Sequence, residues 1–244
     1  MMLITGASGK LGKELVRLFP ESLTPSHSEL PIEDKAAVSK YIASHKPDTT
    51  IHLVAMTSVP GCETDKEKAW KINVEGTRNM VEALRLHSPG CRFVLMSTPC
   101  VFDGDDESPK DESCVPSPDN FYGLTKTVQE AVVSSSGLKH LIVRANFIPY
   151  EKYPHARAFI DRKSTYLFAH NVARGIRDVM DAGLTGIVHI TGDRVLSMYE
   201  LAKMCPDSAD VEPTTMEEYY KTNSHRLTKS MIITSDRWNA YRIG

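Results

Sequence analysis

The chain has 244 residues and a formal net charge of -2, with 41% hydrophobic and 25% charged residues. This length allows one large α/β domain, alone or with a small appendage. Without a basic excess the composition does not predict nucleic acid as a partner, and no apolar run approaches the roughly 20 residues that span a bilayer. No cationic segment precedes an apolar run at the N-terminus, so we expect a cytoplasmic location and no membrane.

Cysteines and histidines show no spacing typical of a metal site. The five cysteines form no C-x-x-C pair, and the nine histidines are scattered. We therefore predict no metal and no disulfide framework, and we interpret the cysteines as packing residues.

The chain opens with a short apolar strand through Thr5 and a G-x-x-G-x-x-G loop at residues 6–12. The first glycine allows a sharp turn into a helix, the second leaves room for a pyrophosphate, and the third lets the helix pack on the strand. Free N–H groups and the helix dipole then favour phosphate, although a plain strand-helix connection is the alternative. The residues expected to hold the pyrophosphate are Gly6, Ser8, Gly9, Lys10, Leu11 and Gly12.

A second strand is predicted at residues 22–24, and no acid follows it before Glu29. An acid at such a strand end commonly holds the adenosine ribose and repels a 2'-phosphate. Ser26 and His27 can instead hydrogen-bond that phosphate, which favours NADP(H) and leaves NAD(H) open. The alternative is that both residues only form a turn.

Strand and helix patterns then alternate, which predicts an α/β fold with a Rossmann-like, doubly wound parallel sheet. Ligands bind outside the carboxyl ends of such strands. We therefore expect Ala55 and Thr57 after the third strand, and Ser97 and Thr98 after the fourth, near the cofactor. We interpret His52, inside an apolar run, as a hydrogen-bonded core histidine. Strands are predicted at 50–55, 92–97 and 138–143, and helices at 33–45, 65–87 and from 119.

The alternation of strands and helices ends at residue 146, and a stretch without periodicity follows. After it we predict a helix at 170–182, a strand at 186–190, and capped helices from Ser197 and near Thr234. We divide the chain into an NAD(P)-binding Rossmann domain, residues 1–146, and a smaller substrate-side region, residues 147–244. This second region is expected to return partly to the Rossmann core.

Tyr122 and Lys126 are four residues apart at the start of a predicted helix, so they share one face. The ammonium, the helix N-terminus and an oxidised nicotinamide are each expected to lower the pKa of the phenol. Tyr122 then serves as a general acid for a carbonyl oxygen that becomes an alcohol, and the Thr98 hydroxyl holds the same oxygen. The alternative is that Tyr122 and Lys126 only form part of a solvated helix face. The glycine loop and the strand end at Thr98, which precede them in the chain, make this alternative less favourable.

Thr98, Tyr122 and Lys126 resemble the catalytic set of the short-chain dehydrogenase/reductase superfamily, extended type. Within it the chain resembles the dTDP-4-dehydrorhamnose reductase family. The resemblance implies hydride transfer from NADPH or NADH to C4 of a nucleotide-linked 4-keto-6-deoxy sugar, a proton from Tyr122, and Lys126 on the nicotinamide ribose. It also implies a scaffold role for Asn73, whose amide is expected to bind a neighbouring strand backbone. The matching stretches are 47–52, 69–79, 101–104 and 122–126, in the family's order.

The chain also departs from this family. The usual S-T-D-Y-V-F-D-G reads S-T-P-C-V-F-D-G at 97–104, L-D-I reads L-P-I at 30–32, and the stretch after Arg144 is short. These changes leave the reductase chemistry unaffected. They disfavour a dehydratase, because the additional acid that it needs beside the threonine is missing, and they leave the identity of the sugar and the nucleotide open.

The regulatory β-subunit of methionine adenosyltransferase resembles the same family, so an NADP-binding regulatory subunit is the alternative. Family members often pair, so a homodimer is compatible with the resemblance.

Overall fold

The computed structural model describes residues 1–243, and its centre is a sheet of five parallel strands in the order β1-β2-β3-β4-β9. This arrangement confirms the predicted Rossmann-like α/β fold. The predicted second strand at 22–24 lies beside β1, but it is reduced to one parallel bridge between Leu3 and Leu23. Pro20 and Pro25 bound that run and leave it too short for a ladder. The strands are β1 (Met2–Thr5), β2 (Thr49–His52), β3 (Arg92–Ser97), β4 (His140–Arg144) and β9 (Gly186–His189).

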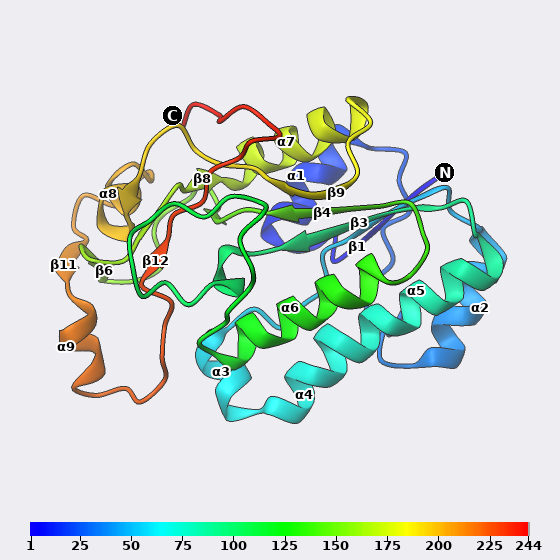
Figure 1. Cartoon of the computed structure of the whole chain (residues 1–244), viewed down its shortest axis with the longest axis horizontal. Helices are drawn as coiled ribbons and strands as arrows, with labels where there is room; N and C mark the ends of the chain where they lie inside the picture. Colours follow the sequence, from blue (N-terminus) through cyan, green and yellow to red (C-terminus); the bar gives the residue numbers. More distant parts are fainter. Residues whose placement is uncertain (244) are drawn as a thin grey trace.

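Helices cover both faces of the sheet (Figure 1). One face carries α1 and α7 in mutual contact, and the other carries α2, α5 and α6. Strand side chains alternate between two hydrophobic cores, so Val94 packs on the α1–α7 side and Phe93 on the α2–α5 side. The helices of these layers are α1 (Lys10–Leu18), α2 (Lys35–His45), α5 (Gly76–His87), α6 (Phe121–Ser134) and α7 (Ala169–Asp181).

The predicted helix at 65–87 is present and contains a π-helical segment that periodicity did not predict. Its parts are α4 (Lys66–Trp70), the π-helix η1 (Lys71–Glu75) and α5, and α3 (Val59–Thr64) precedes them. Within η1, Asn73 Oδ1 accepts the Met56 N–H at 2.7 Å and Nδ2 donates to the Met56 carbonyl at 3.1 Å. As predicted, Asn73 is a scaffold residue that fixes the loop after β2.

The C-terminal region adds a three-stranded sheet, β10-β7-β12, and two two-stranded sheets, β11-β6 and β5-β8. The chain returns to the central sheet through α7 and β9, which pairs with β4. No helix within residues 1–243 has the length and apolarity needed to cross a membrane. The small elements are β5 (Phe147–Ile148), β6 (Arg157–Phe159), β7 (Lys163–Ser164), β8 (Leu167–Phe168), β10 (Leu196–Ser197), α8 (Met198–Lys203), β11 (Glu212–Thr214), α9 (Met216–Tyr220) and β12 (Ser230–Met231).

The two capped helices predicted for this region have different outcomes. At α8, Ser197 Oγ accepts the Glu200 N–H at 3.1 Å and the Glu200 carboxylate accepts the Ser197 N–H at 2.7 Å, which confirms the capping box. The helix predicted near Thr234 is wrong. Ser235 Oγ accepts the Trp238 N–H at 3.0 Å, but only a turn forms, because the chain continues to a bridge between Tyr241 and Gly192.

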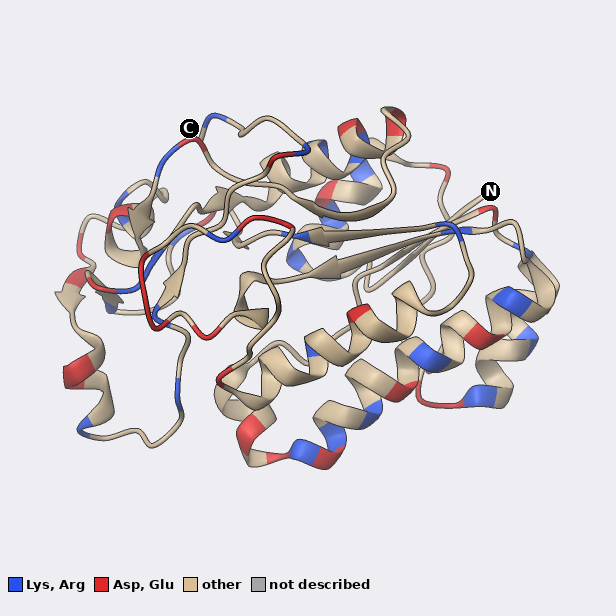
Figure 2. Ribbon diagram, viewed as in Figure 1, with Lys and Arg blue, Asp and Glu red and all other residues tan. Residues whose placement is uncertain are grey.

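The long polar loop after β3 begins with a short 3-10 helix, η2 (Pro99–Val101), and then carries most of its acids. Figure 2 shows these acidic stretches beside basic stretches of the C-terminal region. Glu107 pairs with Lys163 at 2.9 Å, and Asp105 pairs with Arg226. The loop therefore joins the Rossmann core to the C-terminal region.

Candidate active site

One cavity of about 1140 Å³ lies at the carboxyl ends of β1 to β4. The structure brings every predicted catalytic and cofactor-binding residue to its wall, although their roles stay predictions. These residues are Gly6, Ser8, Gly9, Lys10, Leu11, Gly12, Ser26, His27, Ala55, Thr57, Ser97, Thr98, Tyr122 and Lys126.

The glycine loop fits a dinucleotide diphosphate. The helix α1 begins at Lys10, and no side chain caps its N-terminus at Gly9. A Cβ on Gly9 would meet the Gly6 carbonyl oxygen at 3.2 Å and no side-chain atom within 4 Å, so no side chain covers the backbone there. A Cβ on Gly12 would lie 2.3 Å from the Gly6 oxygen, as expected for close helix-strand packing. Uncapped N–H groups, a helix dipole and an unobstructed backbone together suit a phosphate ligand.

The part of the cavity that was predicted to hold the adenosine ribose contains an acid that the sequence prediction did not place there. Ser26 was expected to donate to a 2'-phosphate, but its N–H and Oγ donate to the Glu29 carboxylate at 2.8 and 2.7 Å. These bonds lower the pKa of Glu29, which therefore stays ionised at neutral pH. Glu29 lines the cavity. The turn therefore brings a carboxylate to the position after the second predicted strand, where the sequence analysis expected none. His27 is exposed there and lies 3.8 Å from Glu33.

Replacing Glu29 with glutamine is expected to strengthen NADPH binding by roughly three- to tenfold. The substitution removes a negative charge near a 2'-phosphate and frees Ser26 to donate to it. NADH carries no such phosphate, so its affinity should change little. Fluorescence titrations of both cofactors at low and high salt measure the two effects, and an equal change for both cofactors would contradict this role.

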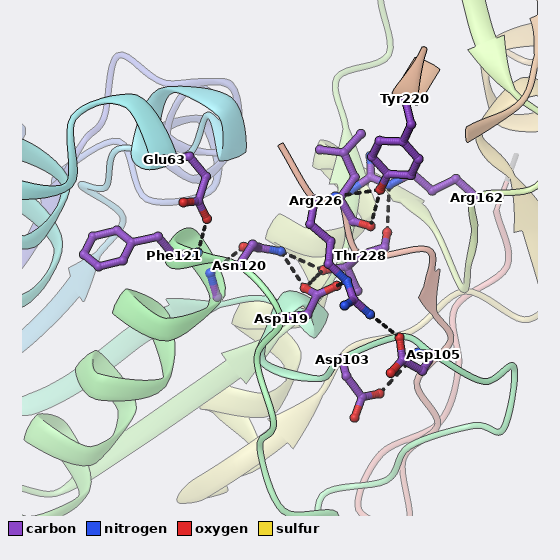
Figure 3. Close-up of polar contacts among 12 residues, drawn as sticks. Glu63, Asp103, Asp105, Asp119, Asn120, Phe121, Arg162, Tyr220, Arg226 and Thr228 are labelled. Carbon is purple, nitrogen blue, oxygen red and sulfur yellow. Dashed lines mark hydrogen bonds and ion pairs between the residues drawn. The ribbon is translucent and has the colours of Figure 1, made fainter. Parts of the chain in front are cut away.

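The start of α6 is held by two side chains from outside the helix. Asn120 Oδ1 accepts the Gly123 N–H at 2.9 Å, and Glu63 accepts the Phe121 N–H at 2.6 Å (Figure 3). A Cβ on Gly123 would lie 2.1 Å from the Cys100 carbonyl, so the helix packs directly on η2. This contact places Tyr122 beside Thr98, and both are nearly buried, at 9% and 8% exposure.

The pKa of Tyr122 moves in the direction opposite to the sequence prediction. Burial is the largest cause and raises this pKa well above its usual value of about 10, and the neighbouring Cys100 raises it further. Hydrogen bonding with Thr98 acts in the opposite direction. The prediction from Lys126, the helix N-terminus and an oxidised nicotinamide did not include burial, and burial outweighs the contributions of the protein's own groups. Tyr122 is therefore a neutral phenol at physiological pH, the form that donates a proton.

Lys126 lines the cavity, is almost completely buried and donates to the Met96 carbonyl at 2.7 Å. Burial lowers the pKa of Lys126 to about 8, and the Glu130 charge opposes that shift.

His52 is fully buried within 2.8 Å of the Thr5 hydroxyl and 3.2 Å of the Thr77 hydroxyl. Burial, and then the Lys126 charge, lower the pKa of His52 to about 3, so it is the neutral core histidine that the sequence predicted.

Affinity for NADPH is expected to fall several-fold as the pH rises through about 8. The pKa of Lys126 lies near 8, so its ammonium is present below that pH and is lost above it. An ammonium binds ribose hydroxyls and nearby phosphates more strongly than a neutral amine. Titrations from pH 6.5 to 9.5 measure the change. The Lys126→Arg variant is charged throughout and should give a flat profile, and a parallel fall in that variant would assign the effect to another group.

Two further features complete the site. The Ser97 hydroxyl was predicted to bind cofactor, but it donates to the buried carboxylate of Glu130. The sequence analysis did not name the residues of a wall that the C-terminal region contributes, because the segments that form this wall lack periodicity. The residues of this wall are Phe147, Ile148, Pro149, His155, Arg162, Leu227 and Met231.

The fold and this site define a Rossmann-type, NAD(P)-dependent oxidoreductase of the extended short-chain class. The chain belongs to the RmlD substrate binding domain family, whose model matches residues 1–162. The predicted resemblance is thereby confirmed.

Named relatives agree with this assignment. The chain is 31% identical to a probable dTDP-4,6-dihydroxy-2-methyloxan-3-one 4-ketoreductase of Streptomyces antibioticus, across 97% of the chain and 87% of the relative. It is 30% identical to dTDP-4-keto-6-deoxy-D-glucose reductase of Streptomyces niveus, across 83% of the chain and 76% of the relative. Among solved structures, dTDP-4-dehydrorhamnose reductase from Bacillus anthracis in complex with NADP matches with a TM-score of 0.85 and 26% identity, covering 96% of this chain and 89% of that one. These relatives do not favour the regulatory-subunit alternative.

Proposed function

We propose that this chain is an NADPH-dependent reductase of a dTDP-linked 4-keto-6-deoxy sugar, related in activity to dTDP-4-dehydrorhamnose reductase. The observation that supports it most is that Thr98, Tyr122 and Lys126 line one cavity together with the glycine loop. The names of the two Streptomyces relatives supply the substrate class, and the Bacillus anthracis complex favours NADP over NAD. NADH is the alternative cofactor.

Each residue has a defined task in this proposal. Bound NADPH would supply the hydride that reduces the C4 carbonyl carbon. Tyr122, a neutral phenol, donates its proton to the C4 oxygen, and Thr98 holds that oxygen in place. Lys126 holds the nicotinamide ribose, and its positive charge stabilises the phenolate that remains after the proton transfer.

Mixing the protein with NADPH and dTDP-4-keto-6-deoxyglucose tests the proposal. We expect one NADPH to be oxidised for each sugar, with a product two hydrogen atoms heavier by mass spectrometry. A rate no higher than that of a Tyr122→Phe control would contradict it.

A homodimer and a cytoplasmic location belong to the same proposal. Both follow from the family resemblance and from the nucleotide-sugar substrate, and neither is needed for the chemistry. Light scattering coupled to size exclusion measures the mass directly, and a mass near 27.2 kDa at all concentrations would exclude the dimer.

A further inference from the structure

The C-terminal wall of the cavity contains one arginine that pairs with no acid. Among the cavity residues, Lys10 binds Glu151 at 2.9 Å and Lys126 donates to a backbone carbonyl. Arg162 lines the same cavity, and within residues 1–243 it forms no ion pair. It is therefore the cation with the most unused capacity to bind an anionic ligand there.

The guanidinium of Arg162 is anchored by one edge. Its Nε donates to the Thr228 carbonyl at 3.0 Å, and Nη2 lies 3.7 Å from the Met231 sulfur, a weak acceptor. Neither Nη atom donates to an oxygen of the described residues. An arginine fixed through Nε presents its remaining N–H groups as a fork, the geometry that suits a phosphate or carboxylate.

The nearby acids already have other partners, as Figure 3 shows for Asp105 and Asp119. The Asp119 carboxylate accepts Arg226 Nε at 3.1 Å, and Arg226 also pairs with Asp105. Asp161, the neighbour of Arg162 in sequence, accepts the Met216 N–H at 3.0 Å. Arg226 thus pairs with Asp105 and Asp119, Asp161 is held by a backbone N–H, and none of the three pairs with Arg162.

The anchor of Arg162 also connects to the helix that carries Tyr122. Thr228 is fully buried, and its hydroxyl donates to Asp119 and accepts from Asn120 Nδ2, each at 3.0 Å. Asn120 is the residue that caps α6. The position of Arg162 is therefore set by the same polar cluster that fixes the start of α6.

We propose that Arg162 binds the diphosphate of the nucleotide sugar and that Asp119, Asn120 and Thr228 position it relative to Tyr122. This inference rests on the proposed function. A sugar with C4 at Tyr122 carries its diphosphate on the anomeric carbon across the ring, so an anion-binding group is needed on another wall of the cavity. Arg162 provides it from the C-terminal region, while the glycine loop serves the diphosphate of the cofactor.

Calorimetric titration of the NADP-saturated protein with dTDP and with thymidine tests the site without requiring turnover. Charged hydrogen bonds of this kind predict a dTDP Kd that is roughly 10- to 100-fold higher for Arg162→Ala than for the wild type. Thymidine lacks the diphosphate, so its affinity should not change. Arg162→Lys should recover only part of the loss, because a lysine is a point charge without the fork.

Arg157→Ala is the matched control. Arg157 lies in β6 of the same region, pairs with Glu212 and Glu218, and is absent from the cavity wall. Its removal should leave the Kd of dTDP unchanged. If Arg162→Ala does not fold, Arg162→Gln gives the same comparison, because its amide can still donate to the Thr228 carbonyl.

Two results would overturn the inference: an unchanged dTDP Kd in a folded Arg162 variant, or equal binding of dTDP and thymidine by the wild type. The two proposals can fail separately. Arg162-dependent dTDP binding without sugar reduction would refute the proposed function and leave the diphosphate site. Sugar reduction with a KM that does not respond to Arg162→Ala would refute the site and leave the function.

Discussion

Replacing Tyr122 with phenylalanine is expected to reduce turnover of the 4-keto sugar by roughly 100- to 10,000-fold, the range that general acid catalysis contributes. The ring stays in its place between η2 and the cavity, and only the proton donor is lost. NADPH affinity should therefore stay within about twofold of the wild-type value, because removing one hydroxyl leaves the glycine loop and Lys126 intact. Single-turnover reduction and a separate NADPH titration measure the two quantities.

Tyr199→Phe is the matched control, because Tyr199 is half-buried on α8 and does not line the cavity. It should retain full turnover. A Tyr122→Phe protein that kept more than about a tenth of the wild-type rate would show that another group donates the proton.

The pH dependence separates the roles of Tyr122 and Lys126. Burial raises the pKa of Tyr122, so its phenol keeps its proton across the neutral and mildly alkaline range. The pKa of Lys126 is lowered to about 8, so its charge is lost within that range. A loss of activity above pH 8 that follows the loss of cofactor affinity would therefore belong to Lys126 and not to the proton donor.

Features set by local sequence were predictable. The glycine loop, the central strands and the spacing of Tyr122 and Lys126 follow from short patterns whose meaning does not depend on distant residues. Strand ends in a parallel sheet meet at one edge, which is why Thr57 and Thr98 could be placed beside the loop from sequence alone.

Features set by chain reversal or burial were not predictable in the same way. Glu29 reaches Ser26 only because the turn folds back, and the raised pKa of Tyr122 requires knowledge of what covers it. Arg162 acquires its place through Thr228, 66 residues away in the sequence. No periodicity encodes such a contact.

The Glu130→Ala substitution is expected to destabilise the protein by about 3–5 kcal/mol, the cost typical of breaking a buried ion pair. Arg144 Nε and Nη2 donate to Glu130 at 2.9 and 2.6 Å, and both side chains are almost completely buried. Removing the carboxylate leaves a buried guanidinium beside His189, which accepts from Arg144 Nη1 at 3.3 Å and cannot neutralise it. Urea denaturation at pH 7 gives the free energy of unfolding.

A double variant, Glu130→Met with Arg144→Met, distinguishes pair loss from cavity formation. Because no charge is left buried, it should recover much of the stability that Glu130→Ala loses. A double variant at least as unstable as the single one would show that packing, and not the ion pair, carries the effect.

Glu130 also opposes the burial shift of Lys126, so its removal should lower the pKa of Lys126 further. The pH above which NADPH binding weakens should then move downward in Glu130→Ala, which ties the stability of the core to the charge state of the site.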